Sequence, residues 1–367
     1  MLKDWTKNME GEMDRMVKRS KNLVRLIRNP RADVGQTPHH VVFRRNKLAM
    51  YRYNCSISQM ASDEPIEEKK QPKCAVPLIF VPSLINRSYI LDLQPGKSLI
   101  EYLVQEGFDV FLIDWGKPGP EDQYQKFDDF IELYLGSAIK KVCRLTGQDK
   151  IHLIGHCLGG MLTLTYAGLY PERIASLMNI TTPFDLSHGG ILKRWSDPMD
   201  VELMTSALGN APWPLLQATF HLLKPMALLQ KAVWFYDNLW HDHRIQSFHA
   251  MEIWSNDNVS IPGGFFRTYI QEYYQNNALY HGTLTIDGKV VDLSQLKVPV
   301  LNVSAEHDHI APPESSNALK EIIPQTQNLV MPGGHIGAVL SRRASKTLWP
   351  QLSAFYQEIT QQETSST

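Results

Sequence analysis

The chain has 367 residues, of which 43% are hydrophobic and 20% are charged, so it contains ample material for a buried core. Its formal net charge of −1 argues against a nucleic-acid partner, because there is no basic excess to meet phosphates. No apolar run approaches the roughly 20 residues that span a bilayer, and the charged N-terminus is unlike a secretory signal, so we expect a cytoplasmic protein without a transmembrane segment.

Residues 1–30 are predicted to form an amphipathic helix, which Pro30 ends. Six apolar residues fall on one face at helical spacing: Met9, Met13, Met16, Val17, Val24 and Ile27. Lysine and arginine residues surround this face. We expect the helix to pack on the domain or on a partner, with a lipid-coated or polymer surface as the alternative.

Beyond this helix the apolar residues follow the pattern of strands. Residues 41–44 and 48–53 predict a hairpin, and a polar surface loop is expected at 61–73. Six continuous apolar runs come next, at residues 77–81, 110–114, 151–154, 175–180, 298–304 and 328–331. Such runs are typical of parallel strands buried on both faces, and helical stretches separate the first four. The alternation predicts a mostly parallel, doubly wound α/β sheet.

A candidate nucleophile follows the strand at 151–154. The chain continues as Gly-His-Cys-Leu-Gly-Gly at residues 155–160 and then enters an apolar run that predicts a helix. Glycines flank such a sharp turn because the strand and helix backbones nearly touch there. The pattern is the nucleophile elbow of α/β-hydrolases, with Cys157 in place of serine. It predicts an α/β-hydrolase fold, although a cysteine after an apolar strand can also be a buried structural thiol.

The alternation of strands and helices breaks after residue 180. Residues 185–292 are predicted to form a mainly helical cap, inserted into a catalytic core made of residues 31–184 and 293–358. Five of the eight tryptophans lie in this insertion. We expect most of them to form the core of the cap, while one or two line an apolar substrate channel. Residues 359–367 are predicted to be a disordered polar tail.

A cysteine nucleophile needs a base and a group that orients the base. In this fold the nucleophile, the acid and the histidine follow one another in that order, at the ends of successive strands. The strand at 298–304 runs into a turn that contains Asp308, the candidate acid, with Glu306 as a second choice. His335 lies in a glycine-rich turn after the last strand and is the expected base.

The residues beside these three are given supporting roles. His156 is expected to line the pocket or to make a hydrogen bond, and His309 to orient the acid. The oxyanion hole is predicted to use the backbone N–H of Leu158. Its second donor should come from the loop after the first buried strand, at Leu84 or Ile85.

The choice of cysteine also bears on the reaction. A thiolate that attacks a thioester forms another thioester, so the acyl group stays activated on the enzyme. A serine ester would be less ready for transfer to a weak hydroxyl nucleophile. Cys157 therefore favours acyl transfer from a thioester over hydrolysis.

Further motifs accompany the segments around Cys157, Asp308 and His335. They lie at residues 81–95, 111–116, 182–185, 269–279 and 291–293. Together, over about residues 34–340, these motifs resemble the polyhydroxyalkanoate synthases. The resemblance implies an acyltransferase that polymerises (R)-3-hydroxyacyl-CoA, in our interpretation 3-hydroxybutyryl-CoA, into a polyester with release of CoA. It also implies that Cys157 is acylated, that His335 deprotonates Cys157 or the incoming 3-hydroxyl, and that Asp308 supports His335 or activates that hydroxyl.

The start of the chain resembles the short, two-subunit forms of this family, class III or class IV, since the single-chain forms have a large N-terminal region. Leu158 stands where short forms often carry glutamine, so the class stays open. The resemblance implies a second synthase subunit, a homodimer or hetero-oligomer, and attachment to polymer granules in the cytoplasm. We expect no cofactor, because the substrate is a CoA thioester, and no metal, because the four cysteines lack metal-type spacing.

Two other functions stay open at this point. A thioesterase or polyester hydrolase of the same fold would admit water where the synthase admits a chain end, and it would release free hydroxy acid. A non-catalytic, granule-associated protein would not need Cys157, Asp308 and His335 together, so their joint presence speaks against it.

Overall fold

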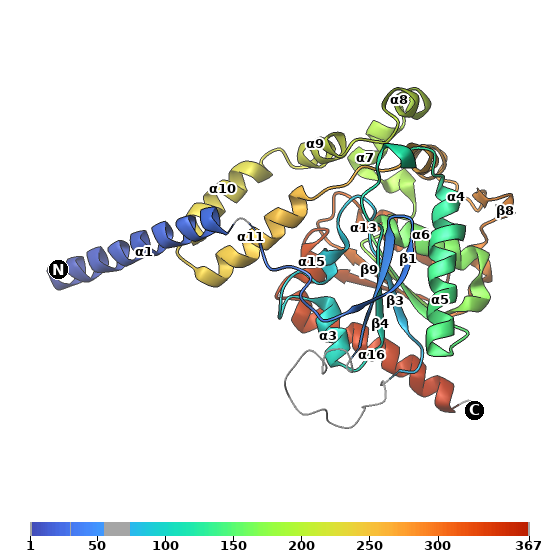
Figure 1. The fold of residues 1–367 in the computed structure, drawn as a ribbon, viewed down its shortest axis with the longest axis horizontal. Helices are drawn as coiled ribbons and strands as arrows, with labels where there is room; N and C mark the ends of the chain where they lie inside the picture. Colours follow the sequence, from blue (N-terminus) through green and yellow to red (C-terminus); the bar gives the residue numbers. More distant parts are fainter. Residues whose placement is uncertain (1, 30, 55–73, 366–367) are drawn as a thin grey trace.

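The structure is a computed structural model that describes residues 2–29, 31–54 and 74–365. The polar loop expected at 61–73 lies outside these residues. Figure 1 shows a twisted central sheet with helices on both sides, a group of helices above it, and a long N-terminal helix that reaches away from the body.

The central sheet has eight strands in the order β1-β2-β4-β3-β5-β6-β9-β10. Their bounds are β1 His40–Arg45, β2 Leu48–Tyr53, β3 Leu78–Val81, β4 Val110–Asp114, β5 Ile151–His156, β6 Ile174–Ile180, β9 Val300–Ala305 and β10 Thr326–Met331. The strands from β4 to β10 are parallel, whereas β1 pairs antiparallel with β2 and β2 with β4. The predicted hairpin and the mostly parallel sheet are confirmed.

The five inner parallel strands are buried along their whole length, which explains their continuous apolar sequences. Successive side chains of β3 enter different clusters. Ile79 and Val81 belong to one apolar cluster, while Leu78 and Phe80 belong to another. The sheet therefore separates two layers of helices, as the twofold alternation of a strand requires.

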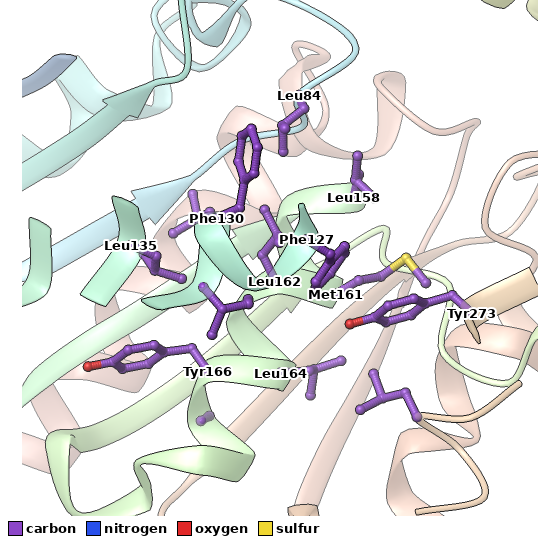
Figure 2. Packing of buried hydrophobic residues seen from close by; sticks show 14 of the residues in the cluster. Leu84, Phe127, Phe130, Leu135, Leu158, Met161, Leu162, Leu164, Tyr166 and Tyr273 are labelled. Atoms are coloured by element: carbon purple, nitrogen blue, oxygen red, sulfur yellow. The ribbon is translucent and has the colours of Figure 1, made fainter. Parts of the chain in front are cut away.

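Helices cover both faces of the sheet. Their bounds are α3 Leu99–Gln105, α4 Phe127–Asp129, α5 Gly136–Thr146, α6 Leu158–Leu169, α12 Gly263–Thr268, α13 Pro313–Asn317, α14 Leu319–Ile322, α15 Gly337–Leu340 and α16 Ala344–Ser365. The cluster around α6 is rich in aromatic rings. Figure 2 shows part of it, with Phe127 beside Met161 of α6; the ring centroids of Phe127 and Tyr273 are 4.9 Å apart. The other cluster contains α3, α15 and α16.

Between β6 and β9 the chain is mostly helical. The helices before α12 are α7 Gly190–Ser196, α8 Val201–Leu208, α9 Trp213–Leu223, α10 Ala227–Asn238 and α11 Asp242–Asn256. A two-stranded hairpin, β7 Thr285–Ile286 and β8 Lys289–Val290, precedes the return to the sheet. In Figure 1, α8, α9 and α10 follow one another in a string above the sheet.

The prediction that most tryptophans of this segment form its core is wrong. Trp195, Trp213 and Trp234 are 39–44% exposed. Trp254, in contrast, is buried, with 7% of its surface exposed. The helices of this segment form a thin layer: α10 packs on α11, where the centroid of the Trp234 ring is 5.1 Å from that of Phe248, and the outward faces stay uncovered.

Helix α1 (Leu2–Arg28) touches the rest of the molecule mainly through polar groups near its C-terminal half. Asn22 Nδ2 donates to the Leu239 carbonyl over 2.8 Å. The Arg15 and Arg19 guanidinium groups lie over the rings of Trp240 and Tyr236. The apolar face that the sequence defines stays exposed, with Met13 at 62% and Ile27 at 70%.

The predicted disordered tail is wrong as far as Ser365, because α16 continues through it. Ile359 is 6% exposed and joins the cluster with α3. Thr360 Oγ1 donates to the Cys74 sulfur over 3.1 Å. The apolar face of α16 thus extends one turn further than the polar composition suggests, and residues 366–367 lie outside the described structure. None of the helices in the described residues is long and apolar enough to cross a membrane.

Candidate active site

The candidate nucleophile lies at the apex between β5 and α6. Cys157 has φ +56° and ψ −126°, a conformation that residues other than glycine rarely adopt. Its N–H donates to the Ile180 carbonyl over 2.9 Å, which ties the apex to the neighbouring strand. Such strain is of the order of 1–3 kcal/mol and persists where the surrounding structure enforces it. The apex is thus a tightly held strand-to-helix turn.

The glycines around the apex are required by close backbone contacts. A Cβ on Gly155 would overlap the Gly160 backbone, and a Cβ on Gly159 would overlap the Val81 carbonyl oxygen at the end of β3. The side-chain-free positions therefore let α6 approach both β5 and β3. This is the mechanical role that the sequence pattern predicts.

We expect Gly159→Ala to lower the free energy of unfolding by about 1–3 kcal/mol, because the added methyl meets a backbone oxygen that cannot rotate away. Thermal denaturation measures this change. Gly11→Ala is the matched control, since a Cβ there has nothing within 4 Å. If Gly159→Ala is as stable as the Gly11 variant, the close approach of α6 to β3 is wrong.

The structure brings Asp308 and His335 into direct contact. His335 Nδ1 donates to Asp308 Oδ2 over 2.7 Å. The other carboxylate oxygen accepts the N–H groups of Ile310 and Ala311, at 2.8 and 3.0 Å. Burial raises the pKa of Asp308, but the His335 charge and these hydrogen bonds outweigh it, so the pKa lies below its ordinary value. Asp308 is therefore an ionised, fully bonded partner of the imidazole.

His335 also faces Cys157. Burial lowers the pKa of His335, but attraction to the Cys157 thiolate and the Asp308 carboxylate, with a hydrogen bond to each, raises it well above its ordinary value. Because Nδ1 is bonded to Asp308, Nε2 is the nitrogen left for the sulfur. The three residues thus form a continuous series from carboxylate to imidazole to sulfur.

This series predicts a pH-dependent stability. The pKa of His335 is raised from 6.5 to about 10, so its imidazolium stabilises the fold fully below about pH 6.5 and loses that contribution as the pH rises towards 10. We expect the difference in Tm between the wild type and His335→Gln to be larger at about pH 6 than at about pH 10. His243→Gln, at an exposed position of α11, is the control variant. A His335 difference that grows with pH would contradict the ion pair.

A cavity of about 240 Å³ opens on these groups. The loops after β3, β5, β9 and β10 line its floor, including Cys157, Asp308 and His335. Helices α9, α10 and α11 cover it, with Phe220 and Trp254 among the lining side chains. The sequence analysis expected a helical cap with one or two tryptophans at the substrate channel, and Trp254 lies there, but it named none of the other covering residues. A helical spacing in the sequence could have indicated these residues. One face of α9 turns to the cavity and carries Gln217, Phe220, His221 and Lys224.

The other predicted site residues divide into those near the cavity and those away from it. His156 and His309 line it, whereas Glu306 is exposed and is not among the lining residues. The Asp308 carboxylate is held by backbone N–H groups and His335, and no hydrogen bond from His309 to it is found within the described chain.

The two candidates for the second oxyanion donor differ in their bonding. The N–H of Ile85 already donates to the Ser83 hydroxyl over 3.2 Å. This occupied donor favours Leu84 as the partner of Leu158, whereas the cavity lining, which includes Ile85 and not Leu84, favours Ile85. Within residues 2–29, 31–54 and 74–365, no group of three or more histidine, cysteine or acidic side chains is arranged to hold a metal.

The sheet order and the strained elbow define this protein as an α/β-hydrolase-fold protein with cysteine at the nucleophile position. The family described as "alpha/beta hydrolase fold" matches residues 76–340, and the family described as "Poly-beta-hydroxybutyrate polymerase (PhaC) N-terminus" matches residues 31–103. The chain belongs to the poly(3-hydroxyalkanoate) polymerase family, a family of acyltransferase enzymes.

Two relatives carry the name poly(3-hydroxyalkanoate) polymerase subunit PhaC. The protein of Allochromatium vinosum is 35% identical, over 94% of this chain and 96% of its own length. The protein of Haloferax mediterranei is 36% identical over 91% of this chain, which spans 66% of that relative. Among solved structures, Rv0554 from Mycobacterium tuberculosis superposes with a TM-score of 0.54 at 16% identity, covering 84% of this chain and 93% of its own. That likeness supports the fold alone.

Proposed function

We propose that the chain polymerises (R)-3-hydroxyacyl-CoA, with 3-hydroxybutyryl-CoA as the first choice, and releases CoA through a thioester on Cys157. The observation that carries this proposal is the series Asp308–His335–Cys157 at the floor of a covered cavity, in a chain of the polymerase family. A cysteine nucleophile keeps the acyl group activated for transfer.

In the first proposed step, the Cys157 thiolate attacks the carbonyl carbon of the CoA thioester. A C–S bond to Cys157 forms, the C–S bond to CoA breaks, and the His335 imidazolium gives its proton to the departing CoA sulfur. The backbone N–H groups of Leu158 and Leu84 are proposed to stabilise the oxyanion of the tetrahedral intermediate. The acyl-enzyme and free CoA result.

In the second proposed step, a 3-hydroxyl group loses its proton to His335 and attacks the Cys157 thioester. An ester C–O bond forms, the C–S bond breaks, and Cys157 leaves as a thiolate beside the protonated His335. Both Asp308 oxygens are already engaged, one by His335 and the other by two backbone N–H groups. This bonding favours Asp308 as the support of His335 over direct activation of the hydroxyl.

The apolar lining of the cavity supports transfer to an alcohol over transfer to water. Phe220, Leu223 and Trp254 lie on the covering side, above Cys157 and His335. An apolar wall offers a water molecule few hydrogen-bond partners, whereas it can bury the methylene and methyl groups of a polyester.

We also propose a second synthase subunit and a granule surface as partners of the exposed apolar residues. These residues lie on α1, α9 and α10: Met13, Met16, Ile27, Trp213, Leu222, Leu228, Leu229 and Val233. Exposed patches of this kind mark interaction sites. The relatives are named as a polymerase subunit, which supports a partner chain, and a homodimer is the other arrangement. A cytoplasmic location on polymer granules follows from this proposal.

The test is incubation of the pure protein with (R)-3-hydroxybutyryl-CoA while free thiol and turbidity are followed together. Thiol release with turbidity supports the synthase, and faster release on addition of a companion subunit supports the two-subunit form. Thiol release in a clear solution, with free hydroxybutyrate, would mean a thioesterase. No thiol release under either condition would contradict the proposed activity.

A further inference from the structure

A second histidine lies beside the candidate nucleophile and has no part in the steps above. His156 is the last residue of β5 and is 3% exposed. It lines the same cavity as Cys157 and His335. Its ring centroid is 5.8 Å from that of His335. A polar side chain therefore occupies the floor of the cavity beside the His335 ring.

The hydrogen bonds of His156 are incomplete. Within the described residues, its buried Nδ1 has no hydrogen-bond partner. His152, on the same strand, shows what a core histidine does here: its Nδ1 bonds to Ser176 over 2.8 Å, and its Nε2 lies 3.4 Å from the Cys74 sulfur. Buried polar groups in proteins are nearly always paired, so an unpaired imidazole at a ligand cavity calls for a function.

The charge state of His156 limits what it can bind. Burial, followed by repulsion from the His335 charge, lowers the pKa of His156 to about 3, so the imidazole is neutral at physiological pH. A neutral imidazole has one N–H donor and one bare acceptor nitrogen. With no acceptor beside the enclosed Nδ1, the proton is favoured on Nε2, which leaves a neutral donor for the cavity.

We propose that His156 donates a hydrogen bond to the 3-hydroxyl oxygen of the acyl group and thereby selects 3-hydroxyacyl thioesters over acyl thioesters that lack the hydroxyl. This inference rests on the proposed function and names a specificity determinant of the same site. The 3-hydroxyl oxygen is three bonds from the carbonyl carbon that Cys157 attacks, and His156 is the residue before Cys157. Both side chains line the same cavity, and the His156 ring is 5.8 Å from that of His335, so the donor lies within the site that holds the acyl group.

The experiment compares (R)-3-hydroxybutyryl-CoA with butyryl-CoA, which differs only in lacking the hydroxyl. Acylation of Cys157 is followed by thiol release in a single turnover and by the mass of the intact protein. We expect the wild type to prefer the hydroxylated substrate about tenfold, as one neutral hydrogen bond provides. We expect His156→Phe to bring the ratio close to one, and His156→Gln, which keeps an N–H donor, to retain part of the preference.

His243→Phe is the control, because His243 is an exposed histidine of α11 that does not line the cavity. Its substrate ratio should equal that of the wild type. A merely structural role of His156 would slow both substrates equally and leave the ratio unchanged, which would overturn the inference. A wild-type ratio near one would also overturn it, even if His156→Phe does not fold. If neither substrate acylates the wild type, the proposed function fails and this inference fails with it.

Discussion

Cys157→Ala is expected to abolish acylation, with a loss of CoA release on the order of 10⁴-fold or more, because the variant lacks the thiol that His335 activates. The substitution removes only the sulfur, so the fold should persist. Cys157 is the thiol that faces His335, and the imidazolium charge depends on it. Thiol release from (R)-3-hydroxybutyryl-CoA and the mass of the acylated protein measure the effect.

Cys143→Ala is the matched control for the nucleophile. Cys143 is a partly exposed thiol at the end of α5, where its sulfur points to the Asp149 carbonyl at 3.9 Å. Burial, the largest influence on this thiol, raises its pKa, so it is a poor nucleophile. The control should release CoA at the wild-type rate. Near-normal CoA release by Cys157→Ala would show that the elbow cysteine is not acylated.

The sheet and the elbow were predictable because their constraints are local in the sequence. A strand buried on both faces must be apolar along its length, and β3, β4 and β5 show this directly. Glycines at 155 and 159 are required by contacts that any strand-to-helix turn of this kind makes. The order of Cys157, Asp308 and His335 follows from the succession of parallel strands, and the structure brings the three together at one edge.

The covering helices were less predictable, because their exposure depends on how they pack and not on composition. Trp213 and Trp234 look like core residues in the sequence, yet the helical layer that carries them is thin and leaves both partly exposed, although Trp234 stacks on Phe248 of α11. The error at the end of α16 was the opposite one, because a segment predicted to be disordered is packed. Ile359 is buried in an apolar cluster, although the residues around it in the sequence are polar. Both errors concern contacts between segments far apart in the chain.

The hydrogen bonds within the site could not be predicted from the sequence either. Leu84 and Ile85 are equivalent as predicted oxyanion donors, and they differ in the structure by the Ser83 hydroxyl, which accepts the Ile85 N–H, and by the cavity, which Ile85 lines and Leu84 does not. The unpaired Nδ1 of His156 is equally invisible in the motif, because pairing depends on the side chains that surround a buried ring. Such bonds decide how a site works more than they decide how a chain folds.

His335→Gln is expected to lower CoA release by several orders of magnitude while the protein stays folded at neutral pH. Glutamine cannot take a proton from a thiol or a hydroxyl, so both the thiolate and the second step lose their base. The loss of rate should approach that of Cys157→Ala, because the effects of substitutions in residues that act as one unit are not additive. The double variant should therefore be no slower than Cys157→Ala alone, and single-turnover thiol release provides the comparison.

Asp308→Asn tests the support that the Asp308 carboxylate gives to His335, while the base itself stays in place. With Oδ2 replaced by an amide, the 2.7 Å bond no longer holds the proton on His335 Nδ1 and the charge that favours imidazolium is lost. The rate should fall strongly, but the pH profile should also change, since the raised pKa of His335 depends on that carboxylate. If His335→Gln keeps a near-normal rate, His335 is not the base, and another group must take the proton.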